Sequence, residues 1–334
     1  MARAETEKLT QILCGAALSR AVCTIAELGI ADQIEPGSPR AVESLAGASG
    51  THERSLYRIL RFLASHEIFQ EKGDRQFDHT PLSQSLRTDA DGSFRPAAQM
   101  FHRVYPFWDG LHHSAITGES GFNKVFGQPL FDYIGSHPLL APIFDAAMPS
   151  IHGHETAAML EAYDFRGVHF LADIGGGNGS LIGAVLQHYP KIRGLLFELG
   201  HVAERARESL KAYGVDGRCS VIEGNFFESV PGGADTYLFR HIVHDWTDEQ
   251  TVQILNNCRK VIPNNGRLLI IEAVVPSGNE PSLAKDFDIL MMVGPGGLER
   301  TKEEYRLLFE QAGFQLSSIT PTTSLVSIVE GKPA

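Results

Sequence analysis

Apolar residues recur at helical spacing in the first half of the chain and in short, strand-like runs in the second half. The change falls near residues 163–167. Before it, the pattern predicts a helix over residues 5–30, a short helix at 45–48 and a third helix with Thr51 as its N-cap. After it, β-rich runs alternate with helical stretches, which is typical of a parallel α/β sheet.

The third predicted helix is followed by a hairpin over residues 68–77, and three helices with a hairpin are the pattern of a winged helix. Further helices are predicted over residues 94–162. Glycines and prolines are expected to break them, namely Gly121, Gly127, Pro138 and Pro149. We therefore divide the chain into a winged-helix dimerisation domain (1–93), a helical linker region (94–162) and a catalytic α/β domain (163–334).

The second half predicts a series of strands separated by helices. The strands cover residues 170–174, 194–197, 219–222, 236–239, 267–274, 314–319 and 324–329, and the helices cover 180–188, 202–213, 248–261 and 302–312. Only a short turn separates the last two strands, so we expect them to pair antiparallel at one sheet edge. The predicted fold class is α/β: a Rossmann-like, mostly parallel sheet with an antiparallel edge strand, preceded by a mainly helical winged-helix domain.

The chain is acidic, with 334 residues, a formal net charge of −11 and no basic stripe. Nucleic acid and anionic membranes both require a positive face, so neither is expected as a partner. The winged-helix pattern could also indicate a transcription regulator. Its third helix, however, offers only Arg54, Arg58 and Arg61 as a basic cluster, which argues against DNA binding.

No secretory leader or membrane span is expected, because no apolar run was found to persist for about 18 residues. The chain has four cysteines, and no two of them form a C-x-x-C motif. We expect free, mostly buried thiols and a cytoplasmic location.

A glycine-rich loop at residues 171–180 ends an apolar strand and opens a helix. Glycines let the backbone approach a ligand closely, and the helix N-terminus adds a partial positive charge. Dinucleotide folds use G-x-G-x-x-G, whereas Ser180 occupies the third glycine's place here. The spacing therefore argues against a dinucleotide, although some α/β proteins turn this way without any ligand.

Acidic, amide and aromatic residues follow the next two strands. Glu198 ends the second strand, where a carboxylate typically binds ribose hydroxyls, but it could equally be a solvated acid at a strand end. After the third strand, the Asn225 amide could accept a hydrogen bond from an adenine amino group, and Phe226 could stack on the ring. The alternative for Phe226 is an ordinary core residue in a turn.

At this point the sequence resembles a known family. Residues 173–179 resemble the cofactor loop of class I S-adenosylmethionine-dependent methyltransferases. Further segments resemble the caffeic-acid and hydroxyindole type of small-molecule O-methyltransferase, in that family's order and near its spacing. These segments are 122–124, 131–133, 244–246, 271–273 and 295–301. The resemblance covers nearly the whole chain.

The resemblance implies that the cofactor is S-adenosylmethionine. The residues that would bind it are Asp173, Gly175, Gly177, Glu198, Asn225, Phe226 and Arg240. The family usually has aspartate where this chain has Glu198 and Asn225, and often lysine in place of Arg240. At Glu198 the side chain is longer by one methylene group, which we expect to be tolerated. At Asn225 the side chain keeps the acceptor oxygen but loses the charge. Arg240 would act through its backbone carbonyl, so that exchange costs little.

His244 is the candidate general base, because a neutral hydroxyl is a poor nucleophile towards a sulfonium and must lose its proton. His244 lies just after the fourth strand, where ligands of this architecture bind. A histidine there could also be structural, but the family resemblance around it favours catalysis. An ordinary histidine titrates near ~6.5 and a phenol near ~10, a gap of roughly 5 kcal/mol. This favours a phenol or an acidic enol over an aliphatic alcohol.

The resemblance places Glu272 and Glu299 on either side of His244, where they would orient the imidazole and stabilise its cation. The alternative for Glu272 is a charge at the end of an apolar strand. The alternative for Glu299 is a surface pair with Arg300 or a helix start before Thr301.

The acceptor pocket is predicted from matching positions in the family. Its predicted residues are Gln99, Val104, Phe144, Met148, Ile289 and Leu290. Plant enzymes commonly have polar residues at the positions of Gln99, Ile151 and Gly294, of which only Gln99 is polar here. This favours a larger, more apolar ring system than caffeate.

Two histidine-rich segments, 112–113 and 152–154, could suggest a metal, but no carboxylate was found to join them at helical spacing, and the family works without one. No metal is therefore expected. The expected partners are a small-molecule hydroxyl acceptor and a second copy of the chain, in a homodimer with exchanged N-terminal helices. The alternative function is a methyltransferase-fold enzyme that binds the cofactor but catalyses decarboxylation or hydroxylation.

Overall fold

The computed structural model describes residues 2–334, so Met1, the first residue of the predicted winged-helix domain, lies outside the described residues. The chain divides into two compact units. The first runs to Pro106 and includes Phe131–Gly153, and the second comprises Phe107–Leu130 and His154–Ala334. The predicted helical region 94–162 is thus divided between the two units.

The first unit is mainly helical and carries a small three-stranded antiparallel sheet of order β1-β3-β2. Its helices and strands are α1 (Ala2–Leu13), α2 (Gly15–Glu27), β1 (Arg40–Ala41), α3 (Val42–Ser49), α4 (Glu53–Ala64), β2 (Phe69–Glu71), β3 (Gln76–His79), α5 (Pro81–Gln84), α6 (Arg95–Val104), most of α9 (Leu130–Ser136) and α10 (Ala141–His152). The predicted hairpin is confirmed as β2 and β3. Its core is formed by apolar residues of α2, α3, α4, β2 and β3.

Three local predictions in this unit are corrected. The predicted helix 5–30 is two helices, which meet at Cys14. The N-cap of α4 is His52 rather than Thr51. Pro149 lies inside α10, where it was expected to break a helix. The change of N-cap shifts a helix boundary by one residue, which sequence patterns specify poorly.

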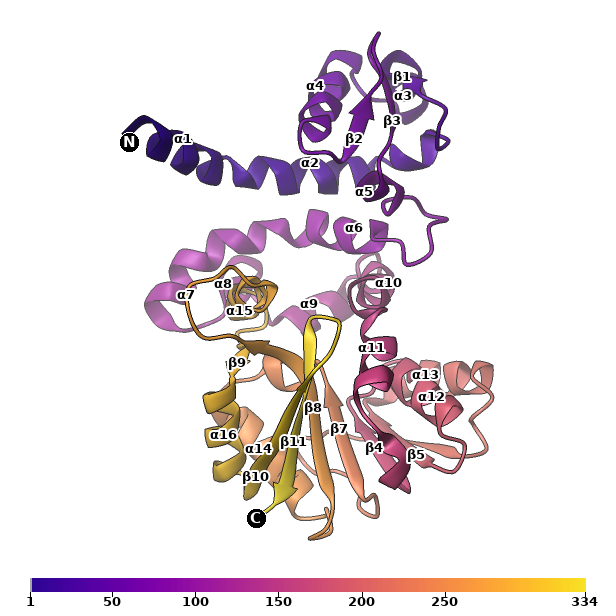
Figure 1. Cartoon of the computed structure of the whole chain (residues 1–334), viewed down its shortest axis with the longest axis vertical. Coiled ribbons are helices and arrows are strands. Elements are labelled where there is room, and N and C mark those ends of the chain that lie inside the picture. Colours follow the sequence, from indigo (N-terminus) through magenta and orange to yellow (C-terminus); the bar gives the residue numbers. More distant parts are fainter. Residues whose placement is uncertain (1) are drawn as a thin grey trace. The chain divides into compact units, whose positions relative to one another are not determined.

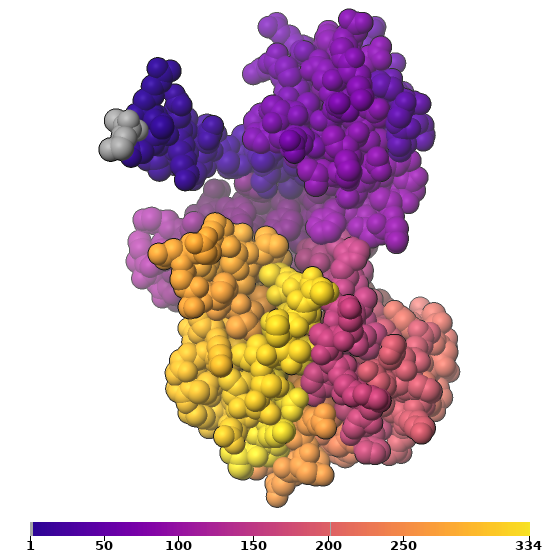
Figure 2. Space-filling model, in the orientation of Figure 1, coloured from indigo at the N-terminus to yellow at the C-terminus, as the bar shows by residue number. Residues whose placement is uncertain are grey.

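Helix α1 exposes three large apolar side chains. Leu9, Ile12 and Leu13 of this segment are 61 %, 63 % and 82 % exposed, and Figure 2 shows α1 in indigo with much of its surface uncovered. Among the described residues, the segment from Arg3 to Glu27 is long and apolar enough to cross a membrane, judged by length and composition alone. This corrects the expectation that no such run exists, although core helices and signal sequences meet the same test.

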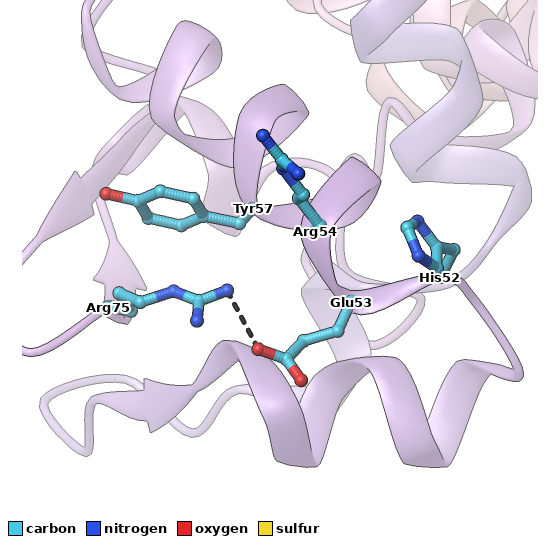
Figure 3. A pocket seen from close by; sticks show the side chains of 5 residues that line it. All are labelled: His52, Glu53, Arg54, Tyr57 and Arg75. Atoms are coloured by element: carbon cyan, nitrogen blue, oxygen red, sulfur yellow. Dashed lines mark ion pairs between the residues drawn. The ribbon is translucent and has the colours of Figure 1, made fainter.

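A shallow hollow on the first unit brings together basic and aromatic side chains of α4 and the hairpin (Figure 3). The Arg75 guanidinium lies 2.8 Å from the Glu53 carboxylate and 4.6 Å from the centre of the Tyr57 ring. Arg75 is therefore partly neutralised within its own unit, and the hollow does not form a uniformly basic face of the kind that binds nucleic acid.

The second unit is a mixed sheet of order β10-β11-β8-β7-β4-β5-β6, with β9 paired to β8. Its strands are β4 (Phe170–Ile174), β5 (Arg193–Glu198), β6 (Cys219–Glu223), β7 (Thr236–Arg240), β8 (Arg267–Val275), β9 (Arg300–Thr301), β10 (Phe314–Pro321) and β11 (Val326–Pro333). Its helices are α7 (Leu111–Thr117), α8 (Gly121–Phe126), α11 (Glu155–Ala162), α12 (Ser180–His188), α13 (Gly200–Ala212), α14 (Asp248–Arg259), α15 (Leu283–Val293) and α16 (Lys302–Gln311).

The predicted strands of the second half are all present, and β10 pairs antiparallel with β11 as expected. The sheet is covered on both faces, because alternate residues of each strand enter two separate cores. One core packs against α14 and α16, and the other against α11, α12 and α13. Figure 1 shows this arrangement around β8 and β7. Helix α15 and the short β9 were not predicted from the sequence.

The chain crosses the sheet in a way that marks one position for ligand binding. From β4 it proceeds outwards through β5 and β6, and it then returns to the other side of β4 as β7. In open α/β sheets ligands bind at such a switch point, beyond the carboxyl ends of the strands. The segments that follow β4 and β7 are therefore the ones to inspect.

Candidate active site

Two turns meet at the carboxyl ends of β4 and β7: the glycine loop after Ile174 and the turn of residues 241–246, which contains a 3₁₀ segment, Val243–Asp245. They touch closely, since a Cβ placed on Gly175 would lie 2.5 Å from Cδ1 of Ile242. Gly175 and Gly177 also have φ of 69° and 56°, a region that favours glycine. Backbone conformation therefore favours glycine at both positions, and at Gly175 the close contact with Ile242 requires it as well.

Asp173 lies beneath this loop and is almost fully buried. Its Oδ2 atom has no hydrogen-bond partner within the described part of the chain. Burial raises the pKa of Asp173 to about 7; the nearby Arg240 guanidinium lowers it and Glu198 raises it. An unpartnered, desolvated carboxylate at a switch point is a suitable neighbour for a cationic ligand.

Glu198 lies at the opening of the loop. Its two carboxylate oxygens accept the backbone N–H groups of Gly177 (3.0 Å) and Leu199 (2.8 Å). Each oxygen keeps a lone pair, so the carboxylate can still accept hydroxyl groups from a ligand.

The segment after β6 forms an aromatic cluster with the turn after β7. Asn225 Oδ1 accepts the N–H of Phe227 at 3.0 Å, which fixes the local turn. The Trp246 ring centre lies 6.2 Å from that of Phe226 and 4.7 Å from that of Phe227, both edge to face. Phe226 is half-buried and packs against one core of the sheet, and its stacking on adenine stays a prediction.

His244 is held by a carboxylate and surrounded by others. Its Nδ1 lies 2.7 Å from Oε1 of Glu299, and both side chains are buried. Nε2 lies 3.8 Å from Oδ1 of Asp245. Burial alone would lower the pKa of His244, but Asp245, Glu299 and Glu272 outweigh it and raise the pKa to about 10. The alternative in which Glu299 and Arg300 form a surface pair is wrong, because both are buried.

Glu272 holds the backbone that carries this histidine. Its Oε1 accepts the N–H groups of Ile242 (3.1 Å), Val243 (2.6 Å) and His244 (3.0 Å), and its Oε2 accepts the hydroxyl of Tyr305 at 2.8 Å. The two predicted glutamates are therefore brought to His244 in different ways. Glu299 contacts the imidazole ring, and Glu272 contacts the backbone turn.

The glycine loop, Glu198 and the buried His244–Glu299 pair lie within the longer of two segments that match family models. Residues 108–315 match the O-methyltransferase domain, and residues 10–89 match the O-methyltransferase dimerisation domain. The chain belongs to the O-methyltransferase family.

Two curated relatives and one solved structure illustrate the similarity. The phenazine O-methyltransferase of Lysobacter antibioticus is 38 % identical, over 97 % of this chain and 95 % of the relative. The 3-amino-4-hydroxybenzoate 4-O-methyltransferase of Streptomyces cremeus is 35 % identical, over 94 % and 86 %. An O-methyltransferase from neocarzinostatin biosynthesis, solved with S-adenosylmethionine and 2-hydroxy-5-methyl naphthoic acid, has a TM-score of 0.83 at 31 % identity and covers 95 % of this chain and 96 % of its own.

This O-methyltransferase uses S-adenosylmethionine and acts on a small-molecule acceptor, and its dimerisation domain makes it a dimer-forming enzyme. Its own residues fit the cofactor. The buried Oδ2 of Asp173 lacks a partner within residues 2–334, and a Cβ placed on Gly177 would meet nothing within 4 Å. The loop therefore offers both open space and negative charge to a cationic nucleoside.

The residues predicted for the acceptor pocket lie on three helices of this O-methyltransferase. Gln99 and Val104 belong to α6, and Phe144 and Met148 belong to α10, which packs on α6 in the first unit. Ile289 and Leu290 belong to α15 of the second unit. Their contact with an acceptor stays a prediction.

Sequence reasoning missed several residues around His244. Arg300 is fully buried: its Nη1 donates to the carbonyl of Val243 (3.0 Å), and its Nη2 donates to that of Trp246 (3.0 Å). The position of Arg300 directly after Glu299 was the available signal. Glu155 was also overlooked. It follows His152 by three residues, so the premise that no carboxylate joins these histidines at helical spacing is wrong.

Proposed function

We propose that this enzyme methylates a phenolic or enolic hydroxyl of a largely apolar aromatic or polyketide-like molecule, with His244 as general base. The observation that carries the proposal is the 2.7 Å contact between His244 Nδ1 and Glu299 at the end of β7, beside the glycine loop. The alternative reactions, decarboxylation and hydroxylation, find no support among the relatives, which are methyltransferases.

The roles of the residues follow from their contacts. S-adenosylmethionine, when bound, supplies an electrophilic methyl carbon on a sulfonium. With Nδ1–H donated to Glu299, the basic nitrogen of neutral His244 is Nε2. Nε2 would take the proton of the acceptor hydroxyl, so that the acceptor oxygen can receive the methyl group that the cofactor would supply. Glu299 stabilises the imidazolium that forms, and Glu272 keeps the turn in place.

The charges around His244 bring its proton affinity close to that of a phenol. An ordinary histidine lies ~3.5 pKa units below a phenol, which makes proton transfer uphill by roughly 5 kcal/mol. Asp245, Glu299 and Glu272 outweigh the effect of burial and raise the pKa of His244 to about 10. Transfer from a phenol to neutral His244 is then close to balanced, which supports a phenol or an enol as the acceptor.

For the cofactor, we assign the ribose hydroxyls to Glu198 and the adenine ring to Phe226 and Asn225. Gly175 and Gly177 would admit the chain of the cofactor, and Asp173 would face its positive charge. The Arg240 side chain donates to Oγ1 of Thr156 at 2.9 Å, and we assign its backbone carbonyl to the cofactor, as the resemblance implies.

For the acceptor, the relatives' names support an aromatic ring. They specify a phenazine, an amino-hydroxybenzoate and a naphthoic acid. The predicted pocket residues Val104, Phe144, Met148, Ile289 and Leu290 are apolar, as such a ring requires, and Gln99 would supply a polar contact.

For the assembly, we propose a homodimer in which the N-terminal helices are exchanged. The exposed leucine and isoleucine side chains of α1 support it, because a second copy would bury them. We propose no nucleic acid, membrane or metal as a partner, and we propose that the enzyme is located in the cytoplasm.

His244→Ala tests the central assignment. Turnover of a phenolic acceptor should fall by roughly 10²–10⁴-fold, the usual range for loss of general-base catalysis. Binding of S-adenosylmethionine, measured by calorimetry, should barely change. His169→Ala serves as the matched control, because His169 is an exposed histidine just before β4. Near-normal turnover in His244→Ala, or a product methylated at nitrogen, would sink the general-base proposal.

A further inference from the structure

Glu299, the carboxylate that contacts the base, is itself held through its backbone. Its N–H donates to Oδ1 of Asp288 at 3.1 Å, while its Oε1 lies 2.7 Å from Nδ1 of His244. Glu299 is buried, so its N–H would lose free energy without such an acceptor. Asp288, Glu299 and His244 therefore form one continuous chain of hydrogen bonds.

Asp288 lies on α15, the helix that carries two of the residues predicted to contact the acceptor. This helix packs against α7, α8 and β8, and Asp288 directly precedes Ile289 and Leu290. Consecutive residues of a helix point in different directions. Asp288 is half-buried and reaches Glu299, whereas Ile289 is 41 % exposed. A single turn of α15 thus connects the predicted acceptor surface to the partner of the base.

The backbone on either side of Glu299 is fixed by other contacts. The N–H of Leu298 donates to the carbonyl of His244 at 2.9 Å. Arg300 pairs with Val274 in the sheet, and its guanidinium binds carbonyl groups of the catalytic turn. Between these two residues, the Glu299 N–H is bound by Asp288 instead. Asp288 is therefore the side chain that determines how this part of the backbone is oriented.

We propose that Asp288 is a positioning residue for the general base: by accepting the N–H of Glu299, it directs the Glu299 carboxylate onto Nδ1 of His244. This inference rests on the proposed function of His244. It also gives α15 a second role, because the helix that would contact the acceptor then holds the base in register with it. Such a supporting contact maintains the geometry that proton transfer requires.

The competing interpretation is that Asp288 acts through its negative charge. Burial lowers the pKa of His244, and the carboxylates that raise it are those of Asp245, Glu299 and Glu272; His241 is the other titratable ring beside it. Asp288 is not among these carboxylates. Its effect on the base is therefore expected to pass through the position of Glu299, and an uncharged side chain with the same acceptor oxygen should replace it.

The charged groups that face Asp288 are consistent with this role. Burial raises the pKa of its carboxyl, the Glu299 N–H lowers it, Glu304 raises it and Arg300 lowers it. The Glu299 N–H has the largest effect among the polar contacts, which agrees with a carboxylate that binds a backbone group rather than a partner charge.

The test measures the pKa of His244 directly, by NMR titration of enzyme labelled at histidine, with His244→Ala to assign the signal. In Asp288→Ala the Glu299 N–H loses its acceptor and the carboxylate is no longer directed at the ring. We expect the pKa of His244 to fall from about 10 towards the ~6.5 of an ordinary histidine. Turnover of 1-naphthol should fall by up to roughly tenfold, because the loss acts through Glu299.

Two single variants serve as controls. Asp288→Asn keeps an acceptor oxygen for the N–H and removes the charge, so it should retain the pKa of His244 and most of the turnover. Asp286→Ala removes an exposed carboxylate from the first turn of the same helix and should change neither. Calorimetry with S-adenosylhomocysteine checks that each variant is folded. If Asp288→Ala is not, Asp288→Ser, whose hydroxyl ends one bond short of Oδ1, takes its place.

A double variant shows whether Asp288 acts through Glu299. In the Glu299→Gln background the charge that Asp288 would direct is already gone, so adding Asp288→Ala should change the pKa of His244 little further. An unchanged pKa in Asp288→Ala, an equal fall in Asp288→Asn, or an additive fall in the double variant overturns the inference. Near-normal turnover in His244→Ala overturns the proposed function instead, and the NMR titration still reports separately on Asp288.

Discussion

Glu272 and Arg300 bind opposite sides of the same backbone turn. Glu272 accepts the N–H groups at the start of the turn, and Arg300 donates to carbonyl groups further along it. The carbonyl of His244, between them, accepts the N–H of Leu298 at 2.9 Å. The base is therefore positioned by its main chain as well as by Glu299, and this arrangement leads to the first three predictions.

The acidic limb of the pH profile should lie far above that of an ordinary histidine. Asp245, Glu272 and Glu299 face His244, together with His241, and the carboxylates raise its pKa to about 10 against the effect of burial. A base works only when unprotonated, so kcat/KM should keep rising from neutral pH towards pH 10. Initial rates with two phenols of different acidity separate this limb from ionisation of the acceptor. A plateau from pH 7 upward would contradict the prediction.

Glu299→Gln should move that limb to lower pH. Glutamine still accepts Nδ1–H, so the ring keeps its orientation, but the negative charge that raises the pKa is lost. The imidazolium is then less stable, and the maximal rate should fall by roughly tenfold or more. Glu272→Gln should shift the limb in the same direction with a smaller rate loss. An unshifted limb in Glu299→Gln would mean that its carboxylate does not set the pKa of the base.

Gly297→Ala should disable the enzyme through backbone overlap. A Cβ at this position would overlap the carbonyl of His244 and lie 2.6 Å from the carbonyl carbon of Asp245. Neither atom can move without shifting the base. We expect kcat to fall by about 10²-fold, the loss that follows when a catalytic group is misplaced by about 1 Å. Gly47→Ala, in α3, is the matched control because its Cβ would meet nothing within 4 Å. Equal activity of the two variants would show that the turn is more adaptable than the contacts indicate.

The sequence predicted the sheet well because its strands are short apolar runs between clear turns, as at β4, where the predicted bounds equal the observed ones. It also brought His244 and Glu299 together, but only through the family resemblance. It could not show that Glu272 binds the backbone instead of the ring, because both contacts place a glutamate at the same point of β8. Nor could it reveal the contact between Asp288 and Glu299, because Asp288 lies on α15, a helix that the apolar pattern did not predict.

Asp173→Asn should stabilise the protein and weaken cofactor binding. Burial raises the pKa of Asp173 to about 7, well above its value in the unfolded chain. The folded state therefore favours the protonated form, and this contribution is lost as the pH rises from about 4 to 7. The gain in Tm of Asp173→Asn over the wild type should accordingly be larger at pH 8 than at pH 5. S-adenosylmethionine affinity, from calorimetry at pH 8, should fall, because the negative charge is gone. A variant with lower Tm at pH 8 would refute this account.

Charges on α1 should dissociate the dimer without damaging the cofactor site. Leu9 and Leu13 are 61 % and 82 % exposed, and in the proposed assembly a second copy covers them. Leu9→Glu with Leu13→Glu should therefore give a monomer in light scattering, because charges would have to be buried in the interface. S-adenosylmethionine binding should persist, since the loop that would hold it lies in the second unit. Transfer to a phenol should fall if exchanged helices complete the acceptor site.

The control variant carries its change outside α1. Thr10→Glu would be a less informative control, because Thr10 lies on the same helix as the two leucines. Glu43→Gln, in α3, is used instead. If the double variant remains dimeric, the interface lies elsewhere. If the wild type binds lipid vesicles and the double variant does not, the apolar helix contacts a membrane instead of a second copy.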